Sequence, residues 1–403
     1  MAVIRPFRAV RPDPAAAPRV AAVPYDVVDT EEARALAGGN PLSFLHVSRA
    51  EIDLPAGTDP HGDIVYRTAA ERYRAMKRDA PLLQDSEPSL YVYHLHADGH
   101  GQTGVAACYS LAEYDSDVIK KHERTRRDKE DDRTRHIVEL RAQTGPVFLA
   151  HRPVPQIDEL ARGIRANAEP LIDFTALDGV QHSIWRVAPQ LVPDFVEAFQ
   201  SVEALYIADG HHRAASGARA RDEVRDSDEA PFLLAVAFPS DQLRILPYNR
   251  VVRDLNGMTP EHFLGEVARR FAMKSGSAMP SEKGEVSMYV AGAWYTLDLD
   301  SAGVPAATVI DSLDGNVLQE RLLKPILDIQ DVRTDKRIDF VGGAKGTKTL
   351  EQLVDAGRMA VAFSMYPVSM IELMDVSDAG QIMPPKSTWF EPRLRDGLLI
   401  HEI

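Results

Sequence analysis

Cysteine is almost missing from this 403-residue sequence, which contains only Cys108. A single cysteine excludes an intrachain disulfide and a metal cage built from several thiolates. Cys108 lies in the apolar run of residues 105–109, and such surroundings favour neither a thiolate nor an exposed side chain. The pattern therefore predicts a buried structural thiol.

Long apolar runs are also missing. No stretch approaches the roughly 18 to 20 apolar residues that a membrane-spanning helix needs. The first residues, MAVIRPFRAVRPDP, place arginine and proline where a signal peptide needs an apolar segment. These absences predict a cytoplasmic protein without a membrane partner.

Positive charge is in the minority, because the formal net charge is -14 and the pI is near 5.4. A phosphate polyanion therefore meets an unfavourable average field, and any nucleotide site must be locally basic. Nucleic acid is not expected as a partner. The sequence leaves a homo-oligomer open.

Hydrophobic residues make up 44% of the sequence, which is enough for a sizeable core divided over two or three domains. Alternating or apolar runs predict strands over residues 89–95, 104–111 and 231–238. Apolar periodicity predicts helices over residues 68–77, 132–143, 156–166, 213–223, 260–272 and 349–356. The mixture, without a regular strand and helix repeat, predicts an α+β (mixed α/β) fold. Domain boundaries near 110 and 255 predict three regions, 1–110, 111–255 and 256–403.

The segment of residues 205–219 carries the strongest chemical signal. Residues 205–208 have the pattern of a buried strand, Asp209 and Gly210 form a turn signal, and a helix-forming segment follows. Backbone N–H groups at a helix start are unpaired and form a site for phosphate oxygens. His211, His212 and Arg213 add donors at this point. The alternative is a common turn in which the histidines only cap a helix.

The motif of residues 209–213, DGHHR, resembles the signature of free-serine kinases of the ParB/sulfiredoxin superfamily. Two further segments match in the same order, residues 119–125 (IKKHERT) and 385–388 (PKST). The whole chain also resembles a bacterial family in which a domain of unknown function carries these motifs. The resemblance implies a ParB/sulfiredoxin-like core in the middle region, with added N-terminal and C-terminal regions. The C-terminal region contributes the PKST loop.

The same resemblance implies a kinase that uses Mg²⁺ and transfers a phosphoryl group from ATP, ADP or another donor to a small-molecule hydroxyl. Free L-serine is the leading acceptor. Glu123 then takes or orients the hydroxyl proton, a role that suits a carboxylate; otherwise it is a solvated residue of a charged helix. Asp209 orients a histidine or holds Mg²⁺, unless it is only a turn residue.

The predicted site residues fall into three groups. The catalytic candidates are Glu123, Asp209 and His212. The phosphate or nucleotide ligands are Gly210, His211, His212, Arg213, Lys386, Ser387 and Thr388, and the candidates for contact with the substrate are Asp26, His122 and Arg250.

A second hypothesis is a non-catalytic protein of the same superfamily that binds a nucleotide or metabolite and regulates a partner. A DNA-partitioning role conflicts with the acidic charge. A sulfiredoxin-like role requires a cysteine in the motif, and Cys108 lies far from residue 209 in the sequence.

Overall fold

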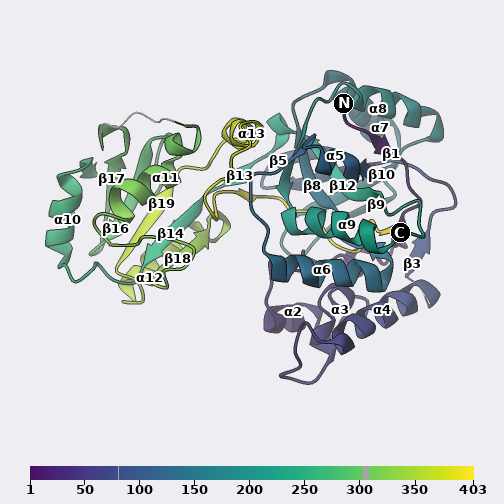
Figure 1. The fold of residues 1–403 in the computed structure, drawn as a ribbon, viewed down its shortest axis with the longest axis horizontal. Coiled ribbons are helices and arrows are strands. Elements are labelled where there is room, and N and C mark those ends of the chain that lie inside the picture. The colour runs from purple at the N-terminus through teal and green to yellow at the C-terminus, as the bar shows by residue number, and fades with distance from the viewer. Residues whose placement is uncertain (80, 303–307) are drawn as a thin grey trace. The chain divides into compact units, whose positions relative to one another are not determined.

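A computed structural model describes residues 1–79, 81–302 and 308–403 (Figure 1). The chain divides into two compact units. Unit 1 comprises residues 1–243 and 392–403, and unit 2 comprises residues 244–391. The predicted cut near 110 falls at the end of a strand in the middle of the unit 1 sheet. Strand patterns do not reveal which strands pair, so the sequence could not show that residues 1–110 and 111–243 share one sheet.

Unit 1 is built around a mixed nine-stranded sheet in the order β6-β11-β8-β12-β5-β4-β10-β9, with β1 also paired to β5. Its strands are β1 (Ile4–Arg5), β4 (Tyr91–Ala97), β5 (His100–Ser110), β6 (Ile119–Lys120), β8 (Val147–His151), β9 (Ile172–Thr175), β10 (Gln181–Arg186), β11 (Leu205–Asp209) and β12 (Phe232–Pro239). The β6–β11 and β8–β12 pairs are parallel, and the other pairs are antiparallel. The three predicted strands are confirmed as β4, β5 and β12, with ends shifted by a few residues.

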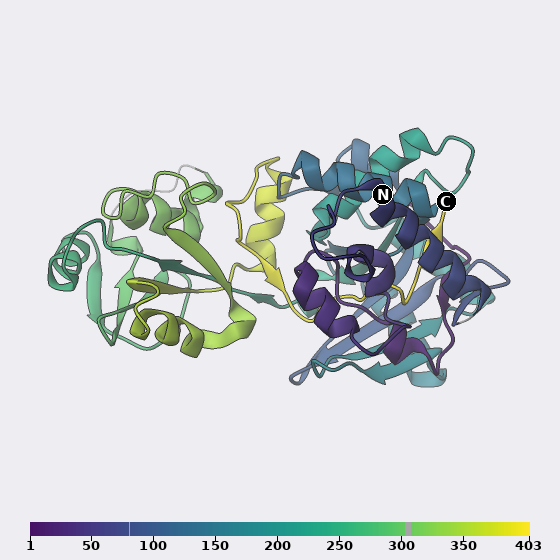
Figure 2. The ribbon, with the colours of Figure 1, turned by 90° about the horizontal axis from the view of Figure 1, so that it is seen from below.

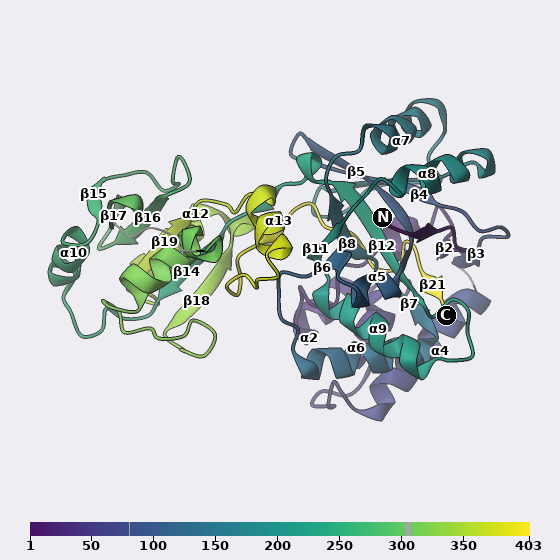
Figure 3. The ribbon, with the colours of Figure 1, turned by 45° about the horizontal axis from the view of Figure 1, so that its top comes forward.

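Three helices cover one face of this sheet: α7 (Pro155–Asn167), α8 (Val192–Phe199) and α9 (His211–Glu223). Their apolar residues share one core with alternate residues of β5 and β12, among them Tyr109 and Leu233. The alternation follows from the two-residue period of a strand. Helix α6 (Arg127–Leu140) lies beside α9, and α4 (Asp63–Arg78) lies beyond α6 (Figure 3).

The N-terminal segment forms a second core with α4 and the end of the chain, which includes Phe44, Tyr73 and Ile400. Its helices, drawn in purple, lie in front of the sheet in Figure 2. Short elements complete unit 1: α1 (Ala17–Val20), α2 (Thr30–Ala37), α3 (Leu45–Ser48), α5 (Leu111–Asp115), β2 (Val10–Pro12), β3 (Leu82–Gln84), β7 (Ala142–Gln143) and β21 (His401–Glu402).

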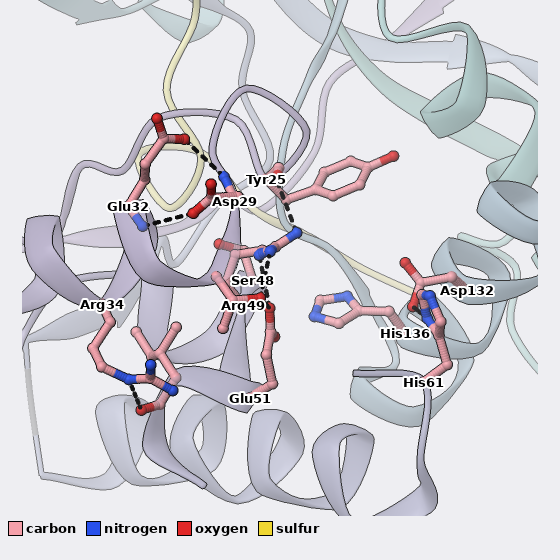
Figure 4. Close-up of polar contacts among 12 residues, drawn as sticks. Tyr25, Asp29, Glu32, Arg34, Ser48, Arg49, Glu51, His61, Asp132 and His136 are labelled. Carbon is pink, nitrogen blue, oxygen red and sulfur yellow. Dashed lines mark hydrogen bonds and ion pairs between the residues drawn. The ribbon is translucent and has the colours of Figure 1, made fainter. Parts of the chain in front are cut away.

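Polar contacts hold the N-terminal segment in place (Figure 4). Asp29 and Glu32 form a capping box at the start of α2, in which each side chain accepts the other residue's backbone N–H. Arg49 pairs with Glu51 at 2.8 Å and also donates to the carbonyl oxygen of Tyr25 at 3.4 Å. Tyr25 is thereby held beside the central sheet.

Unit 2 is an antiparallel six-stranded sheet with helices on both faces. Its strands, in sheet order, are β15 (Ala272–Ser275), β17 (Ala293–Asp298), β16 (Glu285–Val290), β19 (Val361–Met365), β14 (Tyr248–Val252) and β18 (Ile338–Gly342). Its helices are α10 (Pro260–Ala268), α11 (Asp314–Leu318), α12 (Gly346–Asp355) and α13 (Met370–Asp378), and β13 (Ile245–Leu246) pairs with β20 (Trp389–Phe390). Phe263 of α10 packs on the face that carries Val252, whereas Leu350 of α12 packs on the opposite face with Val251.

The predicted mixed α/β class is confirmed by the two sheets and their covering helices. The six predicted helices correspond to α4, α6, α7, α9, α10 and α12, although α4 and α6 each begin five residues earlier than expected. Cys108 is buried, as predicted. No helix within the described residues is both long enough and apolar enough to cross a membrane.

Candidate active site

Two parallel strands bring the first two predicted motifs together. Leu205 of β11 is in register with Ile119 of β6, and Tyr206 with Lys120. Both strands therefore end at the same edge of the sheet, because paired parallel strands run in the same direction. The residues that follow β6 carry Glu123, and those that follow β11 carry Gly210 and the start of α9.

The start of α9 is where the sequence predicts a phosphate site, and we call the space in front of its first backbone N–H groups the helix mouth. Gly210 is its N-cap residue and has a φ of 94°, a left-handed conformation that favours glycine. A Cβ atom at this position would also lie 3.1 Å from Nε of Arg213. No side chain caps the helix start, so its first backbone N–H groups are available to an anion.

The two histidines of the motif hold the segment that contains Glu123. Nε2 of His211 accepts the backbone N–H of His122 at 3.4 Å, and Nε2 of His212 accepts that of Arg126 at 3.1 Å. A neutral imidazole that accepts through Nε2 carries its proton on Nδ1. Burial lowers the pKa of both rings, which favours this neutral form.

Glu123 itself is open to solvent, with 52% of its side chain exposed. Its Oε2 lies 4.0 Å from Nδ1 of His211. The carboxylate is thus at the helix mouth and accessible to a substrate. The fold thus brings together two segments that are separated by more than eighty residues in the sequence.

His122 packs beneath the glutamate, and its ring centroid is 4.4 Å from that of His211. Burial lowers the pKa of His122 to about 4, although Asp209 and the Ile207 backbone oppose the shift. Ligand atoms of His122, Glu123 and His211 all lie within 4.8 Å of one another. Two imidazoles and one carboxylate form a set that suits a transition metal better than Mg²⁺, which prefers oxygen ligands.

Asp209 and Arg213 form a largely buried ion pair, with 2.8 Å between Oδ2 and the guanidinium. Arg213 also donates to the carbonyl oxygen of Pro146 at 2.7 Å, and Arg393 lies 3.8 Å from Oδ1 of Asp209. Asp209 therefore does not fit its predicted role as a Mg²⁺ ligand, because two guanidinium groups already face its carboxylate. The Arg213 side chain is directed toward protein groups rather than toward the helix mouth.

Behind this pair lies a small cavity of about 30 Å³, lined by charged residues from distant segments. Arg133 of α6 stacks over the Tyr25 ring at 4.2 Å, and Asp396 comes from the C-terminal segment. Burial raises the pKa of Asp396 to about 7, although Arg213 and Arg133 oppose the shift. Sequence analysis missed Arg133 and Asp396, because no local motif marks either residue.

Asp26 is the remaining predicted residue of unit 1. Its side chain is exposed, and its charge acts on both Arg213 and His212. Burial alone lowers the pKa of Arg213, but Asp209, Asp26 and Asp396 together raise it above its ordinary value. Asp26 thus lies close enough to the helix mouth to influence a ligand electrostatically.

Four predicted residues belong to unit 2. Lys386 has a φ of 56°, and its ammonium lies 5.4 Å from the centre of the Tyr248 ring. Ser387 donates to the carbonyl oxygen of Pro384 at 2.6 Å, and Thr388 is half-buried. Arg250 is 5% exposed and lines the same cavity as Ser387. The structure thus brings two segments together that are more than a hundred residues apart.

His136 lines the 30 Å³ cavity that also contains Tyr25, and its burial leads us to expect that acid lowers the stability of unit 1. His136 donates to the carbonyl oxygen of Val47 at 3.0 Å, and burial, with Arg133, lowers its pKa to about 4. The unfolded chain, with a histidine pKa near 6.5, binds more protons between these values. The free energy of unfolding therefore falls as the pH is lowered from 6.5 toward 4, by about 1.4 kcal/mol per pH unit for this group.

His136→Gln isolates this contribution from those of the other buried groups, since glutamine can donate but does not titrate. We expect the stability difference between wild type and variant in urea to change by about 2 kcal/mol between pH 7 and pH 5. If the free energies of unfolding of the two proteins instead changed with pH in parallel, His136 would have the same pKa in the folded and unfolded states, and the prediction would be wrong.

Fold and site together define a mixed α/β protein in which an uncapped helix start lies beside an exposed glutamate. Residues 4–316 match the family described as "Protein of unknown function (DUF1015)", and the chain belongs to that family. No curated protein matches the chain.

Several solved structures are distantly similar to this one. A free serine kinase in complex with AMP is 13% identical, with 74% of this chain and 91% of that chain covered and a TM-score of 0.38. SbnI with a C-terminal truncation, from Staphylococcus aureus, is 12% identical, with 72% and 85% covered and a TM-score of 0.38. A conserved hypothetical protein from Pyrococcus furiosus is 13% identical, with 73% and 94% covered and a TM-score of 0.35. Similarities at this level assign no activity to this chain.

Proposed function

We propose that this protein is a small-molecule kinase with a ParB/sulfiredoxin-like core. It transfers a phosphoryl group from ATP, ADP or another phosphate donor to a hydroxyl group, with free L-serine as the leading acceptor. The single observation that carries the proposal is the position of Glu123 at the uncapped start of α9. The motif resemblance of residues 119–125, 209–213 and 385–388 supports the same activity.

The chemistry requires a bound phosphate and a correctly placed hydroxyl, and it asks for little covalent participation by the protein. The N–H groups that follow Gly210 bind phosphate oxygens, assisted by the positive end of the helix dipole. Glu123 accepts a hydrogen bond from the acceptor hydroxyl and takes its proton as the phosphoryl group arrives. His211 and His212 act as positioning residues, because each holds the backbone on one side of Glu123.

The remaining predicted residues have supporting roles in this proposal. Arg213 and Asp209 hold the turn that shapes the helix mouth. Asp26 contributes negative charge that suits the ammonium group of an amino-acid acceptor. Lys386, Ser387 and Thr388, which belong to unit 2, stay proposed phosphate-binding residues.

Magnesium enters the proposal only as the usual companion of a nucleotide, whose phosphate charge it neutralises when bound. The carboxylate of Asp209 does not fit as a ligand of this ion, because it already faces the guanidinium groups of Arg213 and Arg393. The location proposed for the reaction is the cytoplasm.

The proposal is tested by incubating the full chain with Mg²⁺, ATP, ADP or pyrophosphate, and a panel of amino acids and polyols. Phosphorus NMR then reports any new phosphate monoester. We expect a monoester of L-serine or of a similar hydroxylated metabolite. Saturable nucleotide binding without any product would contradict catalysis and favour a regulatory protein that senses the nucleotide.

A variant series at His212 tests the positioning role. His212→Ala removes the acceptor of the Arg126 N–H, and the loss of about one hydrogen bond should lower kcat about tenfold. The KM for the phosphate donor should change little, because no donor contact is removed. His212→Gln keeps an acceptor oxygen and should recover most of the rate. Equal kcat values for Ala and Gln would exclude a role for the acceptor.

A further inference from the structure

Unit 2 contains a buried guanidinium group without a carboxylate partner. Arg250 lies on β14 two residues before Val252, so both side chains point to the same face of the sheet. Val252 belongs to the main apolar core of unit 2, whereas Arg250 places a charge at the next equivalent position. No carboxylate oxygen of the described residues lies within 4.0 Å of its nitrogens.

The surrounding structure makes room for this side chain but does little to neutralise it. Its one hydrogen bond among the described residues is from Nη1 to the carbonyl oxygen of Tyr248, at 2.9 Å. A Cβ atom on Gly315 would lie 2.6 Å from Nη2, so a glycine is needed where α11 passes the guanidinium. Burial lowers the pKa of Arg250 to about 10, although Asp314 opposes the shift.

A negative charge that is also poorly neutralised lines the same cavity. Asp314 accepts the backbone N–H of Gly284 at 3.1 Å, and burial raises the pKa of its carboxyl group to about 6. Lys283 and Glu372, the other charged residues that line the cavity, pair with each other at 2.6 Å. Arg250 and Asp314 thus present opposite charges to one space without forming an ion pair.

We infer that this cavity is a binding site for a small zwitterion, an α-amino acid, whose carboxylate meets Arg250 and whose ammonium group meets Asp314. A guanidinium group presents several donors in a plane that matches a carboxylate. The enclosed space is small, about 20 Å³, only slightly more than one water molecule needs, so a ligand must displace that water and keep its larger part outside the cavity, which excludes a nucleotide. Arg250 and Asp314 both belong to unit 2, so the inference does not depend on the proposed phosphoryl transfer.

Calorimetric titration of the full chain tests the inference with five probes: L-serine, L-alanine, acetate, methylammonium and inorganic phosphate. We expect both amino acids to bind, and each half-ligand to bind at least about tenfold more weakly, because it satisfies one charge only. Phosphate should bind more weakly than the amino acids, because it leaves Asp314 without a cation. Phosphate binding that equals or exceeds that of L-serine, or no amino-acid binding at all, would overturn the inference.

Two variants and a control locate the site. Arg250→Met and Asp314→Asn should each weaken amino-acid binding about tenfold or more. Arg253→Met removes the same charge from an exposed arginine near the end of β14 and should bind like wild type. Unchanged amino-acid affinity in both site variants would place the ligand elsewhere and overturn the assignment.

Thermal unfolding separates binding from a structural role. An unpaired buried charge is costly, so ligand-free Arg250→Met should melt at or above the wild-type temperature while its binding is lost. A lower melting temperature with unchanged binding would show that Arg250 is structural. If Arg250→Met does not fold, Asp314→Asn decides the question by the same titration. Amino-acid binding without phosphorylated product would support this site and contradict only the kinase proposal.

Discussion

Replacing Glu123 by glutamine is expected to lower kcat for phosphoryl transfer about a thousandfold, within the range that general bases contribute. Glutamine has nearly the same shape but cannot take the proton of the acceptor hydroxyl. Nucleotide affinity should remain close to that of wild type, because the N–H groups at the start of α9 are untouched. Steady-state kinetics and a separate nucleotide-binding titration measure the two effects.

Glu223→Gln is the matched control. This exposed glutamate is the last residue of α9, roughly 18 Å from the start of that helix. The substitution should leave kcat and binding unchanged. If Glu123→Gln lost nucleotide affinity while the rate at saturation stayed normal, the glutamate would be a binding residue. The base would then have to be found elsewhere.

The second large effect is expected for stability. Arg213→Met removes a buried guanidinium that bonds Asp209 and the Pro146 carbonyl oxygen, and it leaves both without this donor. Breaking one side of a buried ion pair typically costs several kcal/mol, so we expect unit 1 to lose about 3 kcal/mol. Arg393, 3.8 Å from Asp209, is too distant to replace the lost hydrogen bond.

Trp185 can report this change for unit 1 alone, because the other two tryptophans, Trp294 and Trp389, lie in unit 2 and can be replaced by phenylalanine. Urea unfolding followed by Trp185 fluorescence then gives the free energy of unfolding. Arg219→Met on the same helix is the control, since its ion pairs with Glu130 and Asp131 are partly exposed and should contribute less than about 1 kcal/mol. Equal losses for both variants would show that burial of Arg213 does not strengthen its pair.

The local motifs predicted the secondary structure around residue 210, but only part of the geometry of its side chains. The strand, glycine turn and helix at residues 205–223 were predictable from the sequence, because a strand and a helix each have a characteristic apolar period and glycine marks the turn between them. The sequence did not predict that His211 and His212 accept hydrogen bonds from backbone N–H groups. Their partners come from residues 122 and 126, and the rotation that aims each ring depends on packing.

Arg213 illustrates the same limit. An arginine at a helix start suggests a phosphate ligand, and the resemblance supports that interpretation. In the folded protein its guanidinium turns inward to Asp209 and Pro146, because burial leaves it no water to bind. The choice between an inward and an outward arginine is made by neighbours that lie far away in the sequence.

By itself the sequence determined the periodic elements, the mixed α/β class, the buried cysteine and the order of the motifs, since these depend on neighbouring residues. The tertiary structure alone decided that residues 1–110 share a sheet with residues 111–243, that Glu123 meets the start of α9, and that Arg250 and Asp314 face one cavity without pairing. The physical reason is that strand pairing, burial and side-chain direction arise from contacts between distant residues, which no local pattern encodes.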